Sequence, residues 1–259
     1  MHKVLPLFKS HYSLGKSILT LEKPTGKIKY PVSIFDLLLQ HQLSTLVLVE
    51  DNMSGCLQAS QQAKSNNIRL VFGLRLDVID DMNQKDENSY LKKAKYIIFA
   101  KNAQAYELLV KIWSIAAQEG FYYTPTIDFK TLKKIWNKNL SLAIPFYDSF
   151  LHLNTLHSSV HIPELQDFQE VVFLTENNGL PFDDIITQKV SQYCEGKYQI
   201  LPAQSIYYPS SDDFLAYLAF RCVHNKNMTR RATLEKPELD HMNSDEFNFN
   251  KWLTINENV

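Results

Sequence analysis

The sequence predicts an α/β barrel in a single domain. Apolar side chains make up 45% of the 259 residues, which is enough material for one large core. Segments of strand and helix character alternate along most of the chain, and no repeat, low-complexity tract or linker interrupts them. Recurring β-α units of this kind favour a closed or nearly closed, TIM-barrel-like fold.

The first three predicted strands are parallel. A short apolar run at residues 4–8 and a β-branched run at 45–49 predict buried strands, and a third strand is predicted at 69–78. A helix that begins after Ser33 lies between the first two strands, and a second helix is predicted over 54–66. This strand-helix-strand order implies parallel strands joined by right-handed crossovers.

The remaining elements follow with less regular spacing. Residues 80–93 are polar and rich in turn formers, which predicts an exposed loop or hairpin. A strand at 96–100 precedes a helix whose apolar side chains, from Ala105 to Ile115, share one face. Further strands are predicted at 140–144, 170–174 and 199–201, with a helix at 182–194 and another from Ser211.

Composition excludes several classes of protein. The 27 basic and 28 acidic residues nearly cancel, so any contact with nucleic acid must depend on local patches. The 3 cysteines form no C-x-x-C pair, which is typical of reduced cysteines in a cytosolic protein rather than of disulfides or a zinc site. No apolar run approaches the roughly 20 residues of a membrane span, so no contact with a membrane is expected.

Several motifs, taken in order, resemble one family. They are Lys9-Ser10-His11-Tyr12-Ser13, the segment 50–55, Val71-Phe72-Gly73, Ala100-Lys101-Asn102, the tyrosine-rich segment 120–128 and Ile206-Tyr207-Tyr208. Together they are similar to the N-terminal PHP (polymerase and histidinol phosphatase) domain of bacterial DNA polymerase III alpha chains. The resemblance implies a PHP-type distorted (β/α)7 barrel over residues 1–250, with 251–259 as a C-terminal tail.

The resemblance also identifies the positions at which active PHP domains bind divalent metals through His, Asp and Glu side chains. In this sequence those positions are Leu7, Lys9, Val49, Glu50, Arg75, Ser205 and Tyr207. Leucine and valine cannot coordinate a metal, and a lysine places its own positive charge where a cation would bind. The resemblance therefore implies no bound metal, no cofactor and no PHP-type hydrolysis. It also implies that Lys9 and Arg75 supply the positive charge that the lost metal cluster would have carried.

The function that the resemblance implies is structural. The chain is expected to be a non-catalytic PHP domain or subunit of a DNA polymerase III alpha type replicase, in a bacterial cytoplasm or a phage-infected host. Its expected partners are the catalytic polymerase chain, which it stabilises, and a proofreading exonuclease, which it docks; DNA is contacted only weakly or indirectly. The sequence contains no polymerase palm, so it is interpreted as a domain of a longer chain or as a separately encoded subunit.

Two other functions remain open from the sequence. One is a divergent metal-dependent phosphoesterase with a rebuilt site, drawn from the residual polar residues His11, Glu50 and Asp51 together with His152. The other is a nucleotide-binding protein that uses the segment 15–17, Gly-Lys-Ser, although bulky residues before it do not suit a phosphate-binding loop.

Three surface features have competing interpretations. The basic residues Lys226, Arg230 and Arg231 could contact DNA or a partner, or form a solvated loop. The tyrosines at 122 and 123 could stack on bases, but the family context favours packed residues at a barrel edge. Three histidines are interpreted as surface or loop residues rather than metal ligands: His152, His157 and His161.

Overall fold

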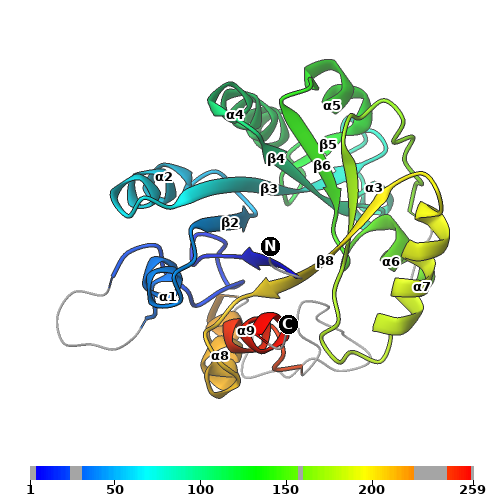
Figure 1. Cartoon of the computed structure of the whole chain (residues 1–259). Coiled ribbons are helices and arrows are strands. Elements are labelled where there is room, and N and C mark those ends of the chain that lie inside the picture. The colour runs from blue at the N-terminus through cyan, green and yellow to red at the C-terminus, as the bar shows by residue number, and fades with distance from the viewer. Residues whose placement is uncertain (1–3, 24–30, 157–159, 225–243, 258–259) are drawn as a thin grey trace.

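Seven strands close into a barrel within the residues that the structure describes, which are 4–23, 31–156, 160–224 and 244–257. In this computed structural model the strands follow the order β2-β1-β8-β7-β6-β4-β3, and pairing of β2 with β3 completes the ring (Figure 1). This confirms the predicted fold class. The strands are β1 (Leu5–Phe8), β2 (Thr45–Glu50), β3 (Arg69–Ile79), β4 (Ala94–Ala100), β5 (Thr126–Asp128), β6 (Leu140–Ile144), β7 (Val171–Thr175) and β8 (Gln199–Ile206).

Most helices lie around the outside of the ring of strands (Figure 1). The helix predicted after Ser33 is α1, and those predicted at 54–66 and 182–194 are α2 and α7. The helices are α1 (Ile34–Gln40), α2 (Cys56–Ser65), α3 (Glu87–Leu91), α4 (Ala103–Gln118), α5 (Phe129–Ile135), α6 (Phe150–Leu156), α7 (Asp183–Cys194), the 3-10 turn η1 (Ser211–Asp213), α8 (Phe214–His224) and α9 (Phe249–Glu257).

One strand of the ring runs against the others. β1, β2 and β3 are parallel, as the sequence predicted, whereas β4 is antiparallel to both of its neighbours, β3 and β6. The connection from β3 to β4 is the polar segment 80–93, and it contains only the short helix α3, which Asp86 caps through the Ser89 amide. A crossover helix is needed to bring a strand back in parallel, so this short connection produces a hairpin instead.

The C-terminal helix belongs to the barrel. Residues 251–257 were expected to be a tail, but they lie in α9, so the boundary drawn at residue 250 falls within a helix. Trp252 is 1% exposed, and its indole Nε1 donates to the carbonyl of Val4 at 2.8 Å. The side chain of Asn256 accepts a hydrogen bond from the Val4 amide in turn. These contacts fix α9 against the chain just before β1.

Candidate functional site at the barrel mouth

The alternation of side chains along the strands determines what fills the barrel. A small apolar cluster draws on all seven strands of the ring and on none of the helices, so it is the barrel interior. Its buried members come from six of these strands, and β3 contributes the partly buried Val71; the buried members are Leu7, Val47, Val49, Ile97, Ala143, Leu174 and Ala203. Side chains two positions further along a strand point to the same face. Two positions beyond Leu7, Leu174 and Ala203, toward the carboxyl ends of β1, β7 and β8, the residues are polar: Lys9, Glu176 and Ser205. On β3 the polar residue is Arg75, four positions beyond Val71.

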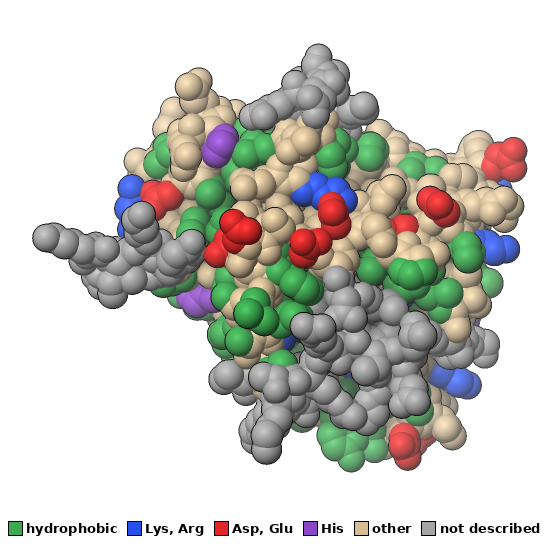
Figure 2. Space-filling view, turned by 90° about the horizontal axis from the view of Figure 1, so that it is seen from below, with side chains coloured by type: hydrophobic (Ala, Val, Ile, Leu, Met, Phe, Trp, Pro, Cys, Tyr) green, Lys and Arg blue, Asp and Glu red, His purple; other side chains and the backbone are tan. Residues whose placement is uncertain are grey.

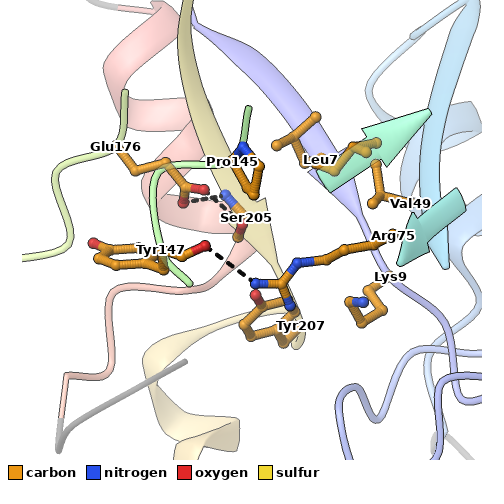
Figure 3. A pocket seen from close by; sticks show the side chains of 10 residues that line it. Leu7, Lys9, Val49, Arg75, Pro145, Tyr147, Glu176, Ser205 and Tyr207 are labelled. Carbon is orange, nitrogen blue, oxygen red and sulfur yellow. Dashed lines mark hydrogen bonds between the residues drawn. The ribbon is translucent and has the colours of Figure 1, made fainter. Parts of the chain in front are cut away.

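These polar residues line a small cavity at the mouth of the barrel (Figure 3). Its volume, measured as the space open to the centre of a water molecule, is about 20 Å³, which is room for about one water. The lining includes six of the seven positions that the family motifs identified: Leu7, Lys9, Val49, Arg75, Ser205 and Tyr207. Four further residues complete it: Ile97, Pro145, Tyr147 and Glu176.

Lys9 is paired with a carboxylate from the neighbouring strand's end. Its ammonium lies 2.7 Å from Asp51 Oδ1, and the lysine is 3% exposed. Burial lowers the pKa of Lys9, and the nearby Arg75 guanidinium adds to this, while Asp51 partly offsets it. Burial alone would raise the pKa of Asp51, but attraction to Lys9 and Arg75 outweighs it and holds that pKa well below its ordinary value. Asp51 is therefore an ionised partner of the lysine.

Arg75 makes the second ion pair of the mouth. Its Nη2 lies 2.7 Å from Asp148 Oδ2 and also donates to the carbonyl of Tyr147 at 3.4 Å. Asp148 has a positive φ of 61°, a conformation that aspartate tolerates better than most residues. Its backbone amide donates to Nδ1 of His152 at 2.9 Å, which helps to fix the turn after β6. The turn thus presents the carboxylate of Asp148 to the guanidinium.

Glu50 is fully buried beside this cavity but does not line it. Its carboxyl group accepts from the Ser10 amide at 2.9 Å and from the hydroxyl of Ser13. Burial raises the pKa of Glu50 to about 7, and attraction to Lys9 offsets only part of that effect. Glu50 therefore organises the turn that follows β1 rather than facing the cavity.

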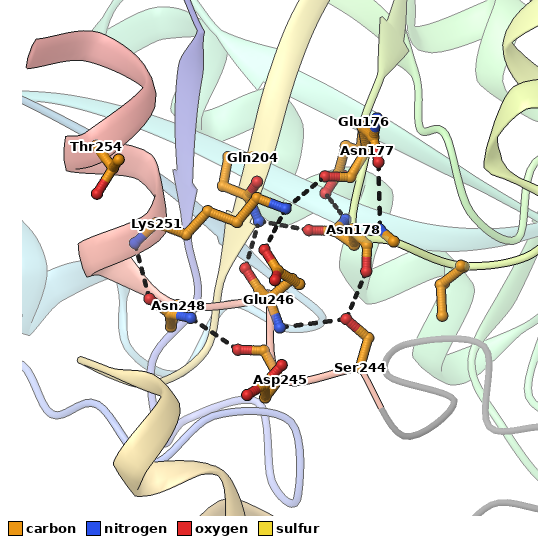
Figure 4. A network of polar contacts seen from close by, with 12 residues as sticks. Glu176, Asn177, Asn178, Gln204, Ser244, Asp245, Glu246, Asn248, Lys251 and Thr254 are labelled. Atoms are coloured by element: carbon orange, nitrogen blue, oxygen red, sulfur yellow. Dashed lines mark hydrogen bonds and ion pairs between the residues drawn. The ribbon is translucent and has the colours of Figure 1, made fainter. Parts of the chain in front are cut away.

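Glu176 connects the cavity to a polar network around the end of β7 (Figure 4). Its carboxyl oxygens accept from the Ser205 amide at 2.9 Å, the Ser205 hydroxyl at 2.8 Å and the Asn178 amide group at 3.1 Å. Gln204 donates to Asn178 Oδ1 and to the carbonyl of Glu246, which joins the segment before α9 to the mouth. Burial raises the pKa of Glu176, and the hydrogen bonds from Ser205 partly offset this.

The side chains present do not fit a divalent metal cluster. Among the residues that the structure describes, no three His, Cys, Asp or Glu side chains are grouped so that they could hold a metal ion. Leu7 and Val49 offer no donor atom, and two positive side chains, Lys9 and Arg75, stand in the lining of the cavity. Metal ligands must carry lone pairs toward the ion, which neither ammonium nor guanidinium can do.

The sequence offered two alternative sites, a residual polar site and a nucleotide site at residues 15–17. None of the three residues of the expected polar site, His11, Glu50 and Asp51, lines this cavity, and a site formed by them stays a prediction. The hydroxyl of Ser17 is buried and donates to the carbonyl of Tyr207. No helix begins within the described residues 9–23, whereas a phosphate-binding loop leads directly into a helix N-terminus. This geometry removes the basis for a nucleotide site at 15–17.

Two interpretations of the sequence are wrong in part. His152 was expected at the surface, but it is fully buried on α6, where its ring packs against Phe182 and Tyr147. Tyr123 was expected to pack at a barrel edge, but it is 74% exposed at a φ of 59°, and its ring contacts those of Tyr90 and Tyr122. His161 is exposed as expected.

On the face viewed in Figure 2, hydrophobic, acidic and basic side chains are interspersed among the coloured atoms. The basic cluster predicted at Lys226, Arg230 and Arg231 lies outside the described residues, as does His157. None of the described helices is long and apolar enough to cross a membrane.

Comparison with known proteins agrees with the barrel and its motifs. Residues 31–172, more than half of the chain, match the model of the PHP domain. The chain belongs to the PHP domain family. This PHP chain is 32% identical over 91 residues to the DNA polymerase III subunit alpha of Helicobacter pylori strain 26695, and 33% identical over 85 residues to that of Borreliella burgdorferi strain B31. The matches cover 35% and 32% of this chain but only 7% of each polymerase subunit.

Proposed function

We propose that this PHP barrel is a non-catalytic component of a DNA polymerase III alpha type replicase, where it stabilises the polymerase chain and docks a proofreading exonuclease. The similarity to polymerase III alpha subunits supports the replication context. The observation that carries the non-catalytic part is the pair of cations, Lys9 and Arg75, in the lining of the barrel-mouth cavity. A site with this lining offers no arrangement for activating a water molecule on a metal.

The size of the cavity supports the same conclusion. A space of about 20 Å³ holds about one water molecule, and a phosphoester would not fit beside the side chains that already fill the mouth. Asp51 and Asp148, which could serve as ligands elsewhere, are each occupied by an ion pair at 2.7 Å. The phosphoesterase alternative therefore has no free carboxylate pair in the lining of this cavity.

Hydrolysis provides the first test. The purified chain is incubated with p-nitrophenyl phosphate and with end-labelled single-stranded DNA, in Mn²⁺ and in EDTA. We expect no turnover that EDTA abolishes. Turnover that is lost both in EDTA and in the variant Asp51→Asn would contradict the non-catalytic role.

Association provides the second test. The chain is mixed with the polymerase III alpha type chain and with the proofreading exonuclease of the same organism, and each mixture is analysed by size-exclusion chromatography. We expect co-elution with both proteins. Separate elution from both of them, at micromolar concentrations and low salt, would refute the role in a replicase.

A further inference from the structure

Charged groups from five different parts of the chain converge at the barrel mouth. Four carboxyl groups surround two cations. The carboxyl groups come from the end of β2, the turn after β6 and the end of β7. The cations come from the end of β1 and from the middle of β3. The residues are Glu50, Asp51, Asp148, Glu176, Lys9 and Arg75. A bound divalent ion such as Ca²⁺ holds several carboxylates together by binding their oxygen atoms.

We propose that Lys9 and Arg75 are built-in cations that hold the mouth of this barrel together and exclude divalent metals from it. The chain's own side chains then supply the positive charge that a bound ion supplies to a cluster of carboxylates. This inference goes beyond the proposed role in a replicase, because it concerns the isolated chain. It can fail or hold whether or not the chain binds a polymerase.

Lys9 connects the ends of two adjacent strands. β1 and β2 pair only at Phe8 and Leu48, so the barrel has little backbone pairing at this seam. Lys9 and Asp51 each lie one residue beyond the end of their strand, and the ion pair between them adds a second link between β1 and β2. The Ser13 hydroxyl, which accepts from the Asp51 amide at 2.9 Å, reinforces the same seam.

Arg75 connects strands that do not pair with each other. β4 separates β3 from β6 in the ring, and Arg75 reaches from β3 to the turn after β6. Figure 3 shows the guanidinium directed toward Tyr147, whose carbonyl it contacts at 3.4 Å. The ion pair with Asp148 therefore spans the mouth, as a metal shared between ligands from separate loops would.

The same geometry explains exclusion of a metal. A divalent ion entering the cavity would meet two buried or nearly buried positive charges, with Lys9 3% and Arg75 7% exposed. Like charges within a few ångströms in a poorly solvated site repel strongly. If the guanidinium is removed, Asp148 and Glu176 lose their cation, and oxygen donors from Ser205 and the Tyr147 carbonyl remain in place. Such a set of oxygens suits Mn²⁺ or Ca²⁺.

Thermal unfolding of three proteins tests the proposal: the wild type, Arg75→Gln and the matched control Arg69→Gln, which changes an exposed residue of the same strand. Each is measured in EDTA and with about 1 mM Mn²⁺ or Ca²⁺. In EDTA we expect Arg75→Gln to unfold at least about 5 °C below the wild type, because the carboxylate of Asp148 loses the guanidinium that it pairs with. Either metal should raise the midpoint of Arg75→Gln by about 3 °C or more, which corresponds to a Kd near 0.1 mM. The wild type and Arg69→Gln should not respond to either ion.

Two results would overturn the proposal. The first is a wild-type chain that Mn²⁺ or Ca²⁺ stabilises as much as Arg75→Gln, since the cations would then not exclude metals. The second is an Arg75→Gln protein that matches the wild type in EDTA, since the cation would then hold nothing together. If Arg75→Gln does not fold in EDTA, refolding in Mn²⁺ still supports the proposal, and failure to fold in either ion, with the control folded, counts against it.

Discussion

Glu50 should make the barrel less stable as the pH rises through neutrality. Its carboxyl group is fully buried, and it accepts hydrogen bonds from the Ser10 amide and the Ser13 hydroxyl. Burial raises its pKa from 4.5 to about 7, although Lys9 and these hydrogen bonds act in the opposite direction. The informative perturbation is Glu50→Gln, which retains the shape and the amide-accepting oxygen but cannot ionise.

The magnitude follows from linkage between protonation and folding. Below pH 4.5, Glu50 is protonated in both the folded and the unfolded chain, so it contributes no difference. Between pH 4.5 and about 7, the unfolded chain releases the proton while the folded chain keeps it, so the free energy of unfolding falls as the pH rises. The slope is about 1.4 kcal/mol per pH unit, which gives a loss of about 3 kcal/mol across this window. Above that window the loss stays constant.

Urea unfolding at several pH values between 4.5 and 8 measures this effect. At pH 4.5 we expect Glu50→Gln to equal the wild type or to be about 1 kcal/mol less stable, because its hydrogen bond with Ser13 is altered. Between pH 4.5 and pH 8 the free energy of unfolding of Glu50→Gln should rise by about 3 kcal/mol relative to that of the wild type, because only the wild type has an ionisable group at this position. The control is Glu107→Gln on the exposed face of α4. Parallel stability curves for the wild type and Glu50→Gln would refute the reasoning.

Two further substitutions test the packing that positions the mouth. Trp252→Ala should lower the free energy of unfolding by about 3–5 kcal/mol, because a large buried side chain is removed. Trp252→Phe should lower it by about 1–3 kcal/mol, because the Val4 carbonyl loses its hydrogen bond from the indole. Equal urea midpoints for Trp252→Ala and the wild type would show that α9 does not support the barrel. Gly120→Ala should lower it by about 3 kcal/mol or more, because a Cβ would lie 1.8 Å from the Thr126 carbonyl oxygen, and an unchanged circular dichroism melting curve would contradict this.

The sequence was informative about apolar runs bounded by turn formers and less so about elements without such a run. The strand predicted at 140–144 is β6, because an apolar run of that length between turn formers has few other solutions. β5 has only three residues, so its pairing with β3 depends on tertiary contacts that no local pattern records. α9 was missed for a different reason: two aromatic residues in a polar segment, Phe249 and Trp252, were not recognised as a buried helix face.

The site was predictable in its positions but not in its pairings. Six positions that the motifs identified do line one cavity. Glu176 was also within reach of the sequence, because it continues the inward alternation of Val172 and Leu174 along β7. Asp148 was not, since it lies 73 residues from Arg75 and reaches it only through a turn with a positive φ. Local patterns carry no information about such a contact.

Each buried cation at the mouth requires the carboxylate that it faces. A cation placed alone in this buried layer would lose its hydration without compensation, which costs several kcal/mol. Lys9 and Arg75 are tolerated because Asp51 and Asp148 lie 2.7 Å from them. Each carboxylate is therefore as necessary to the mouth as the cation it faces, although only the cations occupy positions that the family motifs single out. Of these two carboxylates, Asp51 lies in the motif segment 50–55, whereas Asp148 lies in none of the motifs, so a search by motif would find only one of the two pairs in full.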